Sequence, residues 1–352
     1  MRTSWTAFAT ILAVACKDQT RRCKLFELST LLLWLVSACG GGGANAGATQ
    51  PPVTQPPGTL PAGWTKLADM PAGVAKFGVA AVAGKIVVAG GYDTQRGVMV
   101  YDISTNTWST GAALPRGSDN LTAVAAGNNV YAIGGEAGTA VQVYDLISAA
   151  WTAGPALPGV RFASAAAVLG NRVHVVGGWN ANNAASASFA SQVVFDLGTQ
   201  AWSSAASLTT ARNAAGAAVI DDRLYVVGGR SPGIRANDQQ RLASVEVYTA
   251  AANSWAAGVP LLAARASLAV VALDGRLYAL GGETTAGTVS DAVERFDPAT
   301  QAWAALPVMP YKVHGLGAVV VGTSIYVMGG FTGASDAQGT ESAALYRYTP
   351  TN

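Results

Sequence analysis

Apolar and polar residues alternate along this chain in short runs that repeat from residue 64 to the C-terminus. Each unit begins with a run of small apolar residues, as in Ala214–Ile220, and continues with a β-branched run that ends in two glycines, as in Arg223–Gly229. A third run carries an aromatic residue, as in Ala292–Phe296, and a fourth begins at a tryptophan. Such short runs, separated by turn residues, predict four β-strands per unit rather than helices.

The spacing of these marker residues is constant from one unit to the next. Each of six tryptophans is followed after 26 residues by the first glycine of a pair, and in five units an aromatic residue precedes the next tryptophan by seven positions. The tryptophans are Trp64, Trp108, Trp151, Trp202, Trp255 and Trp303. The glycine pairs begin at Gly90, Gly134, Gly177, Gly228, Gly281 and Gly329. Two fixed intervals in this many copies indicate a repeat architecture.

These markers resemble the Kelch repeat, in which a double glycine is followed by Tyr-Asp and then by Trp, in blades of about 50 residues. The resemblance covers residues 64–350 and implies an all-β fold, a six-bladed Kelch β-propeller with four-stranded blades. The last glycine pair is followed by Leu345–Tyr348 but by no further tryptophan. We therefore expect residues 64–71, around Trp64, to join the C-terminal blade beside residues 343–350 and to close the ring.

The N-terminal part of the chain predicts export and attachment to a membrane. A basic stretch, the apolar run Leu28–Val36 and the small residues before Cys39 are typical of a secretory signal peptide over residues 1–38. The apolar run is shorter than the roughly 20 residues of a transmembrane helix. The segment Leu35–Cys39 also resembles the bacterial lipobox, which implies lipidation of Cys39; ordinary signal cleavage is the alternative. Within that resemblance, Gly40 points to an outer-membrane lipoprotein that faces the periplasm or the cell surface.

The composition separates a tether from the repeat domain and excludes one class of partner. Residues 39–63 hold the predicted lipidated cysteine and a Gly/Pro-rich stretch typical of a spacer, and residues 64–352 form the predicted propeller. Beyond residue 38 the chain carries 17 basic and 18 acidic side chains, so it has no field that would attract nucleic acid. All three cysteines lie within the first 39 residues. We expect a monomer without a metal site or cofactor.

All the length variation between repeats falls between the glycine pair and the next aromatic residue. Binding loops tolerate insertions, so these loops form the predicted functional face. The loop before each first strand opens on the same face and carries basic residues, among them Arg161, Arg212, Arg265 and Lys312. Because arginine binds carboxylates through paired hydrogen bonds, a ring of these groups predicts binding of a carboxylate or an acidic peptide. The alternative is that the arginines brace neighbouring blades.

The residues that follow the glycine pairs add aromatic and charged side chains to this face. We expect four of them to contact a sugar or a peptide, namely Tyr92, Trp179, Arg230 and Phe331. Three residues are candidates for acid–base catalysis, namely Glu136 and Glu283, which also follow glycine pairs, and His314 in the last pre-strand loop. His174 takes a position that is tyrosine in four sister repeats, and we expect it in the core.

Two classes of function fit these observations. The first is a non-catalytic binding module that presents its loop face to a protein or a glycan. The second is an enzyme: the resemblance to exported Kelch propellers includes the sialic-acid (N-acetylneuraminate) mutarotases, whose substrate carries a carboxylate. The sequence has no histidine, cysteine and aspartate spacing typical of metal sites and no glycine-rich phosphate loop. This favours the binding module, although fold alone does not decide function.

Overall fold

The computed structural model describes residues 59–92, 95–180, 188–231, 240–284, 287–333, 336 and 339–350. The chain divides into two compact units, Met1–Thr54 and Gln55–Asn352, and the second contains all the described residues. The predicted signal peptide, Cys39 and the tether before residue 59 lie outside them. Within the described residues, no helix has the length and apolar character needed to span a membrane.

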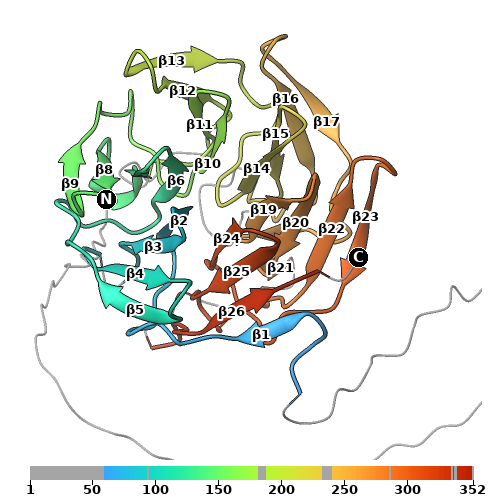
Figure 1. The fold of residues 1–352 in the computed structure, drawn as a ribbon. Helices are drawn as coiled ribbons and strands as arrows, with labels where there is room; N and C mark the ends of the chain where they lie inside the picture. Colours follow the sequence, from blue (N-terminus) through green and yellow to red (C-terminus); the bar gives the residue numbers. More distant parts are fainter. Residues whose placement is uncertain are drawn as a thin grey trace, which may run out of the picture. The chain divides into compact units, whose positions relative to one another are not determined.

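The second unit is a ring of six antiparallel four-stranded sheets, which confirms the predicted six-bladed propeller (Figure 1). Blade 1 contains β2 (Gly78–Val82), β3 (Lys85–Ala89), β4 (Val98–Asp102) and β5 (Thr107–Thr110). Blade 2 contains β6 (Thr122–Ala126), β7 (Asn129–Ile133), β8 (Val141–Asp145) and β9 (Ala150–Ala153). Blade 3 contains β10 (Ala165–Leu169), β11 (Arg172–Val176), β12 (Gln192–Asp196) and β13 (Ala201–Ala205).

The other three blades repeat this order. Blade 4 contains β14 (Gly216–Ile220), β15 (Arg223–Val227), β16 (Val245–Thr249) and β17 (Ser254–Gly258). Blade 5 contains β19 (Ala269–Leu273), β20 (Arg276–Leu280), β22 (Val293–Asp297) and β23 (Ala302–Leu306). Blade 6 contains β24 (Gly317–Val321), β25 (Ser324–Met328), β26 (Leu345–Tyr348) and the N-terminal β1 (Trp64–Lys66).

The N-terminal strand completes the last blade, as the sequence predicts. β1 pairs antiparallel with β26, and Trp64 lies opposite Tyr348 with the two ring centroids 4.8 Å apart. The Trp64 side chain is only 6% exposed. Because the first and last strands of the domain share one sheet, the ring has no free edge at its seam.

The constant interval of seven residues reflects a cross-strand pair on the outer hairpin of each blade. Tyr101 lies opposite Trp108 on β4 and β5, with ring centroids 5.0 Å apart, and the later blades repeat this pairing. The indole Nε1–H of Trp108 donates to the carbonyl of Ala68, just after the outermost strand of the preceding blade, at 2.9 Å. Trp303 donates in the same way to Val259, at 2.9 Å. Each such tryptophan therefore packs its own hairpin and ties it to the preceding blade.

The glycine pairs lie where each second strand meets the loop that leads to the third strand of the same blade. In blade 4, Gly228 and Gly229 have φ values of 64° and 100°. A Cβ atom on Gly228 would lie 2.5 Å from the carbonyl oxygen of Arg265, and one on Gly229 would lie 2.7 Å from that of Asn213. Both the positive φ and the close backbone approach require glycine.

A closed ring of backbone hydrogen bonds surrounds the propeller axis. One residue in the loop before each first strand donates its N–H to the equivalent carbonyl of the preceding blade, at 2.8–2.9 Å, until the circle closes. We call these the ring residues; they are Lys76, Asn120, Ala163, Ala214, Ser267 and Gly315. All six have positive φ, between 47° and 61°. The six blades are thus linked at the axis independently of side-chain identity.

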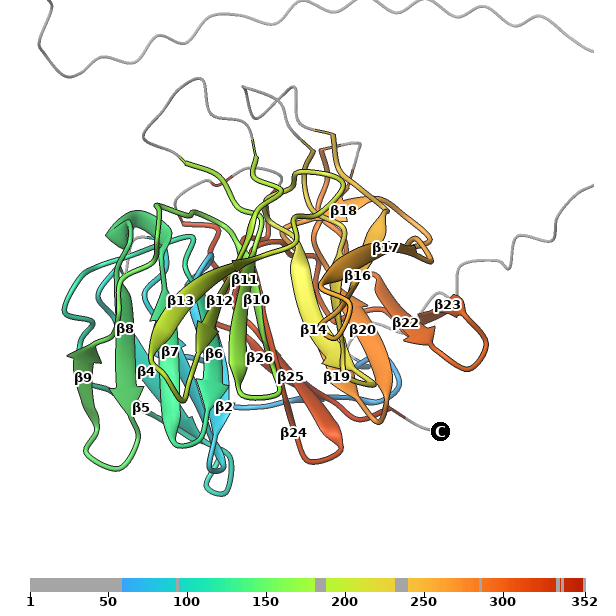
Figure 2. The same ribbon diagram turned by 90° about the horizontal axis from the view of Figure 1, so that it is seen from above.

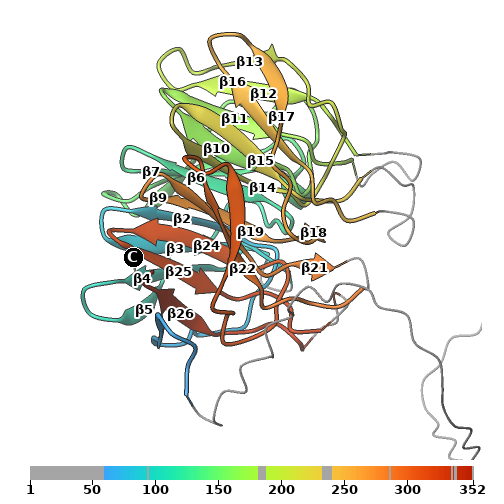
Figure 3. The same cartoon turned by 90° about the vertical axis from the view of Figure 1, so that its right-hand side faces the viewer.

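The loops between the second and third strands project from one side of the ring, which we call the loop face (Figure 2). Two short strands, β18 (Arg265–Ala266) and β21 (Glu283–Thr284), pair on this side (Figure 3). A single 3₁₀ turn, η1 (Gly135–Ala137), follows β7. His174 is 2% exposed and packs against the ring of Tyr248 between blades 3 and 4, which confirms its predicted place in the core.

We predict that Trp64→Ala destabilises the domain more than Trp151→Ala does. Both side chains stack on the aromatic residue opposite, but Trp64 is buried at the seam whereas Trp151 is half-buried on the outer strand of blade 2. Loss of a buried aromatic side chain costs about 3–5 kcal/mol. Urea unfolding of the two variants measures the difference. Equal losses would show that closure by β1 adds nothing beyond ordinary packing.

Candidate functional site

The loop face carries two side-chain positions per blade, arranged by the same backbone geometry. The residue after each glycine pair, here called the rim residue, bonds to the residue that precedes the ring residue of the same blade. These pairs are Ala75 with Tyr92, Asp119 with Glu136, Phe162 with Trp179, Asn213 with Arg230, Ala266 with Glu283, and His314 with Phe331. The backbone scaffold is constant while the side chains at these positions change from blade to blade, so this face is the candidate site.

A cavity of about 290 Å³ lies at the axis on this face, bounded by residues of all six blades. Its polar and aromatic walls are formed by Lys76, Asn120, Trp179, Asn213, Arg230, Ser267 and Asp336. Its apolar lining is formed chiefly by Phe77, Leu121, Leu268 and Leu316. A concave site with apolar contacts and a few convergent polar groups is the usual form of a small-ligand site. Of the predicted ligand-binding residues, the structure places Trp179 and Arg230 here.

Three of the predicted residues meet in one ionic cluster beside the cavity. Glu283, 5% exposed, pairs through Oε1 with Arg230 and lies 3.1 Å from Nδ1 of His314. Arg241 donates to the other carboxylate oxygen at 2.9 Å. Burial alone would raise the pKa of Glu283, but the adjacent His314 and the charge of Arg230 outweigh it and hold the pKa well below its usual range. Glu283 is therefore a permanent counter-ion and a poor general base.

The arginines predicted to form a binding ring are buried inside the wall. Arg161, Arg212 and Arg265 are 6%, 1% and 0% exposed. The backbone carbonyl of each arginine accepts a hydrogen bond from the N–H of the second glycine in the pair of the preceding blade. The guanidinium of the same arginine donates to the carbonyl of the first glycine in the pair of the following blade. Arg212 and Arg265 also pair with Glu246 and Glu294, at 2.7 and 2.8 Å. This geometry favours the bracing alternative over ligand contact.

Two other blades place different donors against the same glycine carbonyl. Ser118 Oγ donates to Gly134 at 2.8 Å, and the Tyr311 hydroxyl donates to Gly329 at 3.1 Å. A buried carbonyl without a donor is costly, so this position selects a hydrogen-bond donor and not a charge as such. Lys312, the other predicted basic residue, is exposed in the loop before β24.

The remaining predicted residues are divided between two parts of the face. Phe331 is fully buried, and its ring centroid lies 5.4 Å from that of His314 and 5.3 Å from that of Tyr92. It therefore packs against the histidine of the ionic cluster. Glu136 is exposed on blade 2, where it accepts a hydrogen bond from Gln95 at 2.9 Å. The structure therefore brings Glu283 and His314 together but keeps Glu136 apart from them.

Two acidic residues of this face, Asp119 and Asp336, were not singled out from the sequence, and Lys76 stood out only as a basic residue near the arginine positions. Asp119 is 6% exposed, its Oδ1 has no hydrogen-bond partner among the described residues, and burial raises its pKa. Burial and the charge of Asp119 also raise the pKa of Glu136. Lys76 lines the cavity and forms an ion pair with Asp336. Aligning the residues just before each first strand would have exposed Lys76 and Asp119, because sister blades carry unrelated residues there.

Among the residues that the structure describes, no three His, Cys, Asp or Glu side chains gather so that they could hold a metal ion. The polar groups of the cavity are instead amides, two hydroxyls, cations and one carboxylate. This set suits hydrogen bonding and charge pairing with an organic ligand.

Comparison with known proteins identifies the repeat. The family profile described as the KLHDC2/KLHL20/DRC7 Kelch-repeats domain matches residues 122–330, and the Kelch motif matches residues 75–115 and 313–352. Similar curated proteins include Kelch-like protein 35 of Mus musculus, 36% identical over 37% of this chain and 21% of its own length. Another is Kelch-like protein terF of Aspergillus terreus, 30% identical over 40% of this chain and 31% of its own length.

The chain spans only about a fifth to a third of the length of these relatives. A solved structure titled "Structure of YjhT" matches with a TM-score of 0.69 at 16% sequence identity, covering 81% of this chain and 97% of that chain. At this identity the match concerns the fold.

We predict that Arg265→Ala destabilises the domain more than Arg161→Ala does. Removal of Arg265 leaves Glu294 buried without its cation, a change that costs about 3–5 kcal/mol. Arg161 bonds only to backbone carbonyls and the Ser191 hydroxyl, so its loss costs about 1–3 kcal/mol. Chemical denaturation compares the two. Full stability in both variants would contradict the bracing role and favour ligand contact by these arginines.

Proposed function

Because this chain belongs to the Kelch-repeat family of β-propellers, we propose that it is a recognition module that binds a carboxylate-bearing ligand in its axial cavity. Kelch propellers generally bind protein partners. The observation that carries the proposal is the presence of two cations, Lys76 and Arg230, in the lining of one cavity beside the half-buried ring of Trp179. An acidic peptide and a sugar acid share the carboxylate that these cations would bind.

Both cations retain the capacity to bind an added anion. The partner of Lys76 is Asp336, and their side chains are 14% and 42% exposed, so solvent screens the carboxylate side of this ion pair. The partner of Arg230 is Glu283, which is shared with Arg241 and His314. One carboxylate divided among several donors leaves a net positive potential at the cavity wall. A ligand carboxylate at the axis would reach both cations.

The state of Glu283 supports binding over catalysis. General acid–base catalysis needs a group that exchanges a proton near the working pH. Cationic neighbours hold Glu283 ionised, and its interactions position Arg230 and Ser267 at the cavity. We infer that the cluster is a rigid support for recognition.

The proposal includes attachment to a membrane. Lipidation of Cys39 would anchor the chain at the outer membrane, and residues 40–63 would hold the propeller away from the lipid surface. The loop face would then be presented to the periplasm or the outside of the cell. A monomer suffices for this role, since a single propeller forms the whole axial cavity.

A sialic-acid mutarotase is the second candidate, and one observation favours it. Asp119 and Glu136 lie on the same blade beside Asn120 of the cavity wall, and burial raises the pKa of both carboxyl groups. Mutarotation requires an acid and a base near the anomeric oxygen, and carboxyls with raised pKa values suit proton transfer. The sugar carboxylate would occupy the same cationic wall.

We predict that Lys76→Met weakens carboxylate binding by about tenfold or more, the effect of losing one charge-assisted hydrogen bond. Calorimetric titration of the full chain in detergent would use two probes, N-acetylneuraminate and a blocked tri-glutamate peptide. Lys66→Met, which removes an exposed lysine from β1, serves as the matched control and should leave binding unchanged. The tighter probe identifies the source of the carboxylate. Absence of millimolar binding by either probe, or equal binding by the Lys76→Met variant, would refute the proposal.

We also predict that the protein does not accelerate the exchange between the anomers of N-acetylneuraminate, as followed by proton NMR. The Glu136→Gln variant provides the control, because it preserves the size of the side chain while removing its acid. Acceleration by the wild type that disappears in this variant would establish the enzyme in place of the binding module.

A further inference from the structure

The junction between blades 3 and 4 lacks two large side chains that fill several of the other junctions. The second position after the third strand's aromatic residue is Ile103, Leu146 and Leu197 in blades 1 to 3, and each packs against a core cluster between blades. In blade 4 this position is Ala250. Across the same junction, His174 replaces the tyrosine found in four sister blades. Two side chains that are smaller than those of sister blades therefore meet at this junction.

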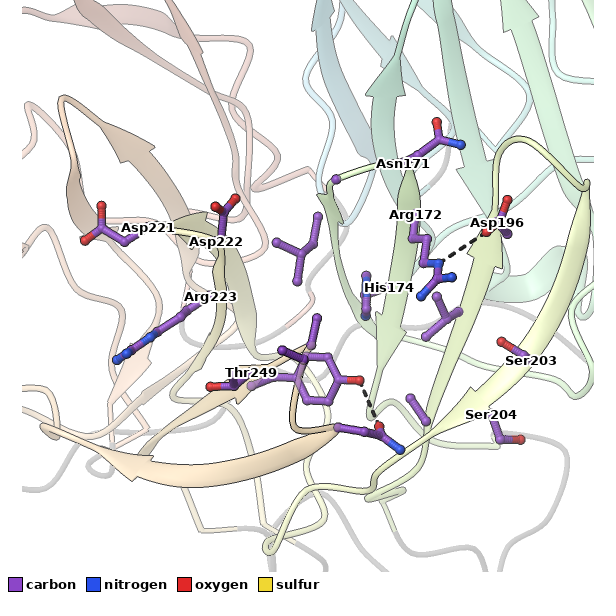
Figure 4. Close-up of a pocket in the computed structure, with 18 residues that line it drawn as sticks. Asn171, Arg172, His174, Asp196, Ser203, Ser204, Asp221, Asp222, Arg223 and Thr249 are labelled. Atoms are coloured by element: carbon purple, nitrogen blue, oxygen red, sulfur yellow. Dashed lines mark hydrogen bonds and ion pairs between the residues drawn. The ribbon is translucent and has the colours of Figure 1, made fainter.

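A cleft of about 800 Å³ results (Figure 4). It is bounded by the turn between β10 and β11 and by the turn between β14 and β15, so it opens on the side of the ring opposite the loop face. Leu169, Val194, Ala205 and the ring of Tyr248 supply apolar surface, and polar groups line the rest. The cleft is thus separate from the axial cavity.

The hydrogen bonds around His174 determine which ring nitrogen carries its proton. The indole of Trp255, which can only donate, bonds to Oε1 of Gln192 at 3.1 Å, and this fixes the orientation of the Gln192 amide. The amide nitrogen then faces Nδ1 of His174 at 2.6 Å, so Nδ1 is the acceptor. Burial, with the nearby charge of Arg172, lowers the pKa of His174 to about 4, and the ring is neutral at pH 7. A neutral ring with Nδ1 as acceptor carries its hydrogen on Nε2.

Within the described residues His174 makes its hydrogen bond through Nδ1, which leaves Nε2–H available to solvent or to a ligand in the cleft. His174 is 98% buried yet lines the cleft, so an acceptor supplied from the cleft would complete its hydrogen bonding. Arg172 lies on the same wall and pairs through Nε with Asp196 at 3.2 Å. Its side chain is 59% exposed, which leaves the guanidinium accessible to a second anion.

The opposite wall carries charges of both signs, because Asp221, Asp222 and Arg223 all line the cleft. Asp221 and Asp222 occupy the turn at the start of blade 4, and both are exposed. In Figure 4, Asp222 lies across the cleft from Arg172 and His174. The cleft therefore has hydrogen-bond donors and the Arg172–Asp196 ion pair on the blade 3 wall, two carboxylates beside Arg223 on the blade 4 wall, and apolar surface between them.

We propose that this cleft binds a small zwitterion with an apolar side chain, such as a free amino acid or a dipeptide. The ligand carboxylate accepts a hydrogen bond from Nε2–H of His174 and pairs with Arg172, its ammonium group faces Asp222, and its side chain occupies the space left by Ala250. Charge complementarity at both ends selects a dipolar ligand over a simple cation or anion. The site does not depend on the function proposed for the loop face.

Imidazole NMR of the full chain in detergent tests this inference. The chain has only two histidines, so the ¹⁵N signals of His174 and His314 are assigned with one variant. We expect the Nε2–H tautomer at His174, and a saturable shift of its Nε2 signal with L-leucine or L-alanyl-L-leucine. N-acetyl-L-leucine lacks the ammonium group and L-leucinamide lacks the carboxylate; each should bind at least about tenfold more weakly, the effect of losing one charged contact.

Two variants restore the residues of sister blades and should abolish the shift by filling the cleft. Ala250→Leu introduces the side chain found at Leu146 and Leu197 and is read at the His174 signal. His174→Tyr introduces the side chain of Tyr225 and is read by calorimetry with the same ligands. Both replace empty space with packing, so the fold should be retained. Lys66→Met, on β1, should leave leucine binding unchanged.

Three results would overturn the inference. The first is a proton on Nδ1 of His174. The second is the absence of a saturable shift with both zwitterions up to about 20 mM, a concentration at which even millimolar ligands saturate. The third is equal binding of leucine and its two derivatives, or unchanged binding after both cleft-filling substitutions. A failure of carboxylate binding at the axial cavity would not bear on any of them.

Discussion

The closed circle of six backbone hydrogen bonds at the axis is the constraint on which the rest of this propeller depends. Each bond joins neighbouring blades and uses the N–H and the carbonyl of a residue with positive φ. The backbone there is fully occupied, so it offers few groups to a ligand. Side chains remain available, and each blade offers one from its rim residue and one from the residue that precedes its ring residue.

A second set of bonds extends this linkage outward. The carbonyl of each first glycine must accept a bond near the blade junction, and arginine, serine and tyrosine supply the donor in different blades. Where arginine does so, its own carbonyl accepts a bond from the preceding blade. Arg212 and Arg265 also bring buried glutamates with them. Their charge serves the architecture, and the charged side chains that line the axial cavity are those of Lys76, Arg230 and Asp336.

The repeat and the closure of the ring could be predicted from the sequence because they rest on spacing. A seven-residue interval is a hairpin with Tyr101 opposite Trp108, and the missing last tryptophan is supplied by Trp64. The site was only partly predictable. Arg161, Arg212 and Arg265 stood out because they repeat, and repetition marks residues that hold a scaffold together. Asp119 and Lys76 do not repeat. The cleft between blades 3 and 4 arises from His174 and Ala250, which are smaller than the tyrosine and leucine at these positions in sister blades. Their combined effect appears only when both residues are placed across one junction.

The strand that closes the ring is also the strand that follows directly on the N-terminal segment of the chain. Any mechanical load carried along that segment would reach β1 before any other part of the domain. β1 holds to β26 through three paired residues, and the first of them, Trp64 against Tyr348, is the most strongly packed. The carbonyl of Gly63 adds a bond from Thr349 at 2.9 Å immediately before it. A force applied to the N-terminal segment would therefore act first on the most strongly packed contact between β1 and β26.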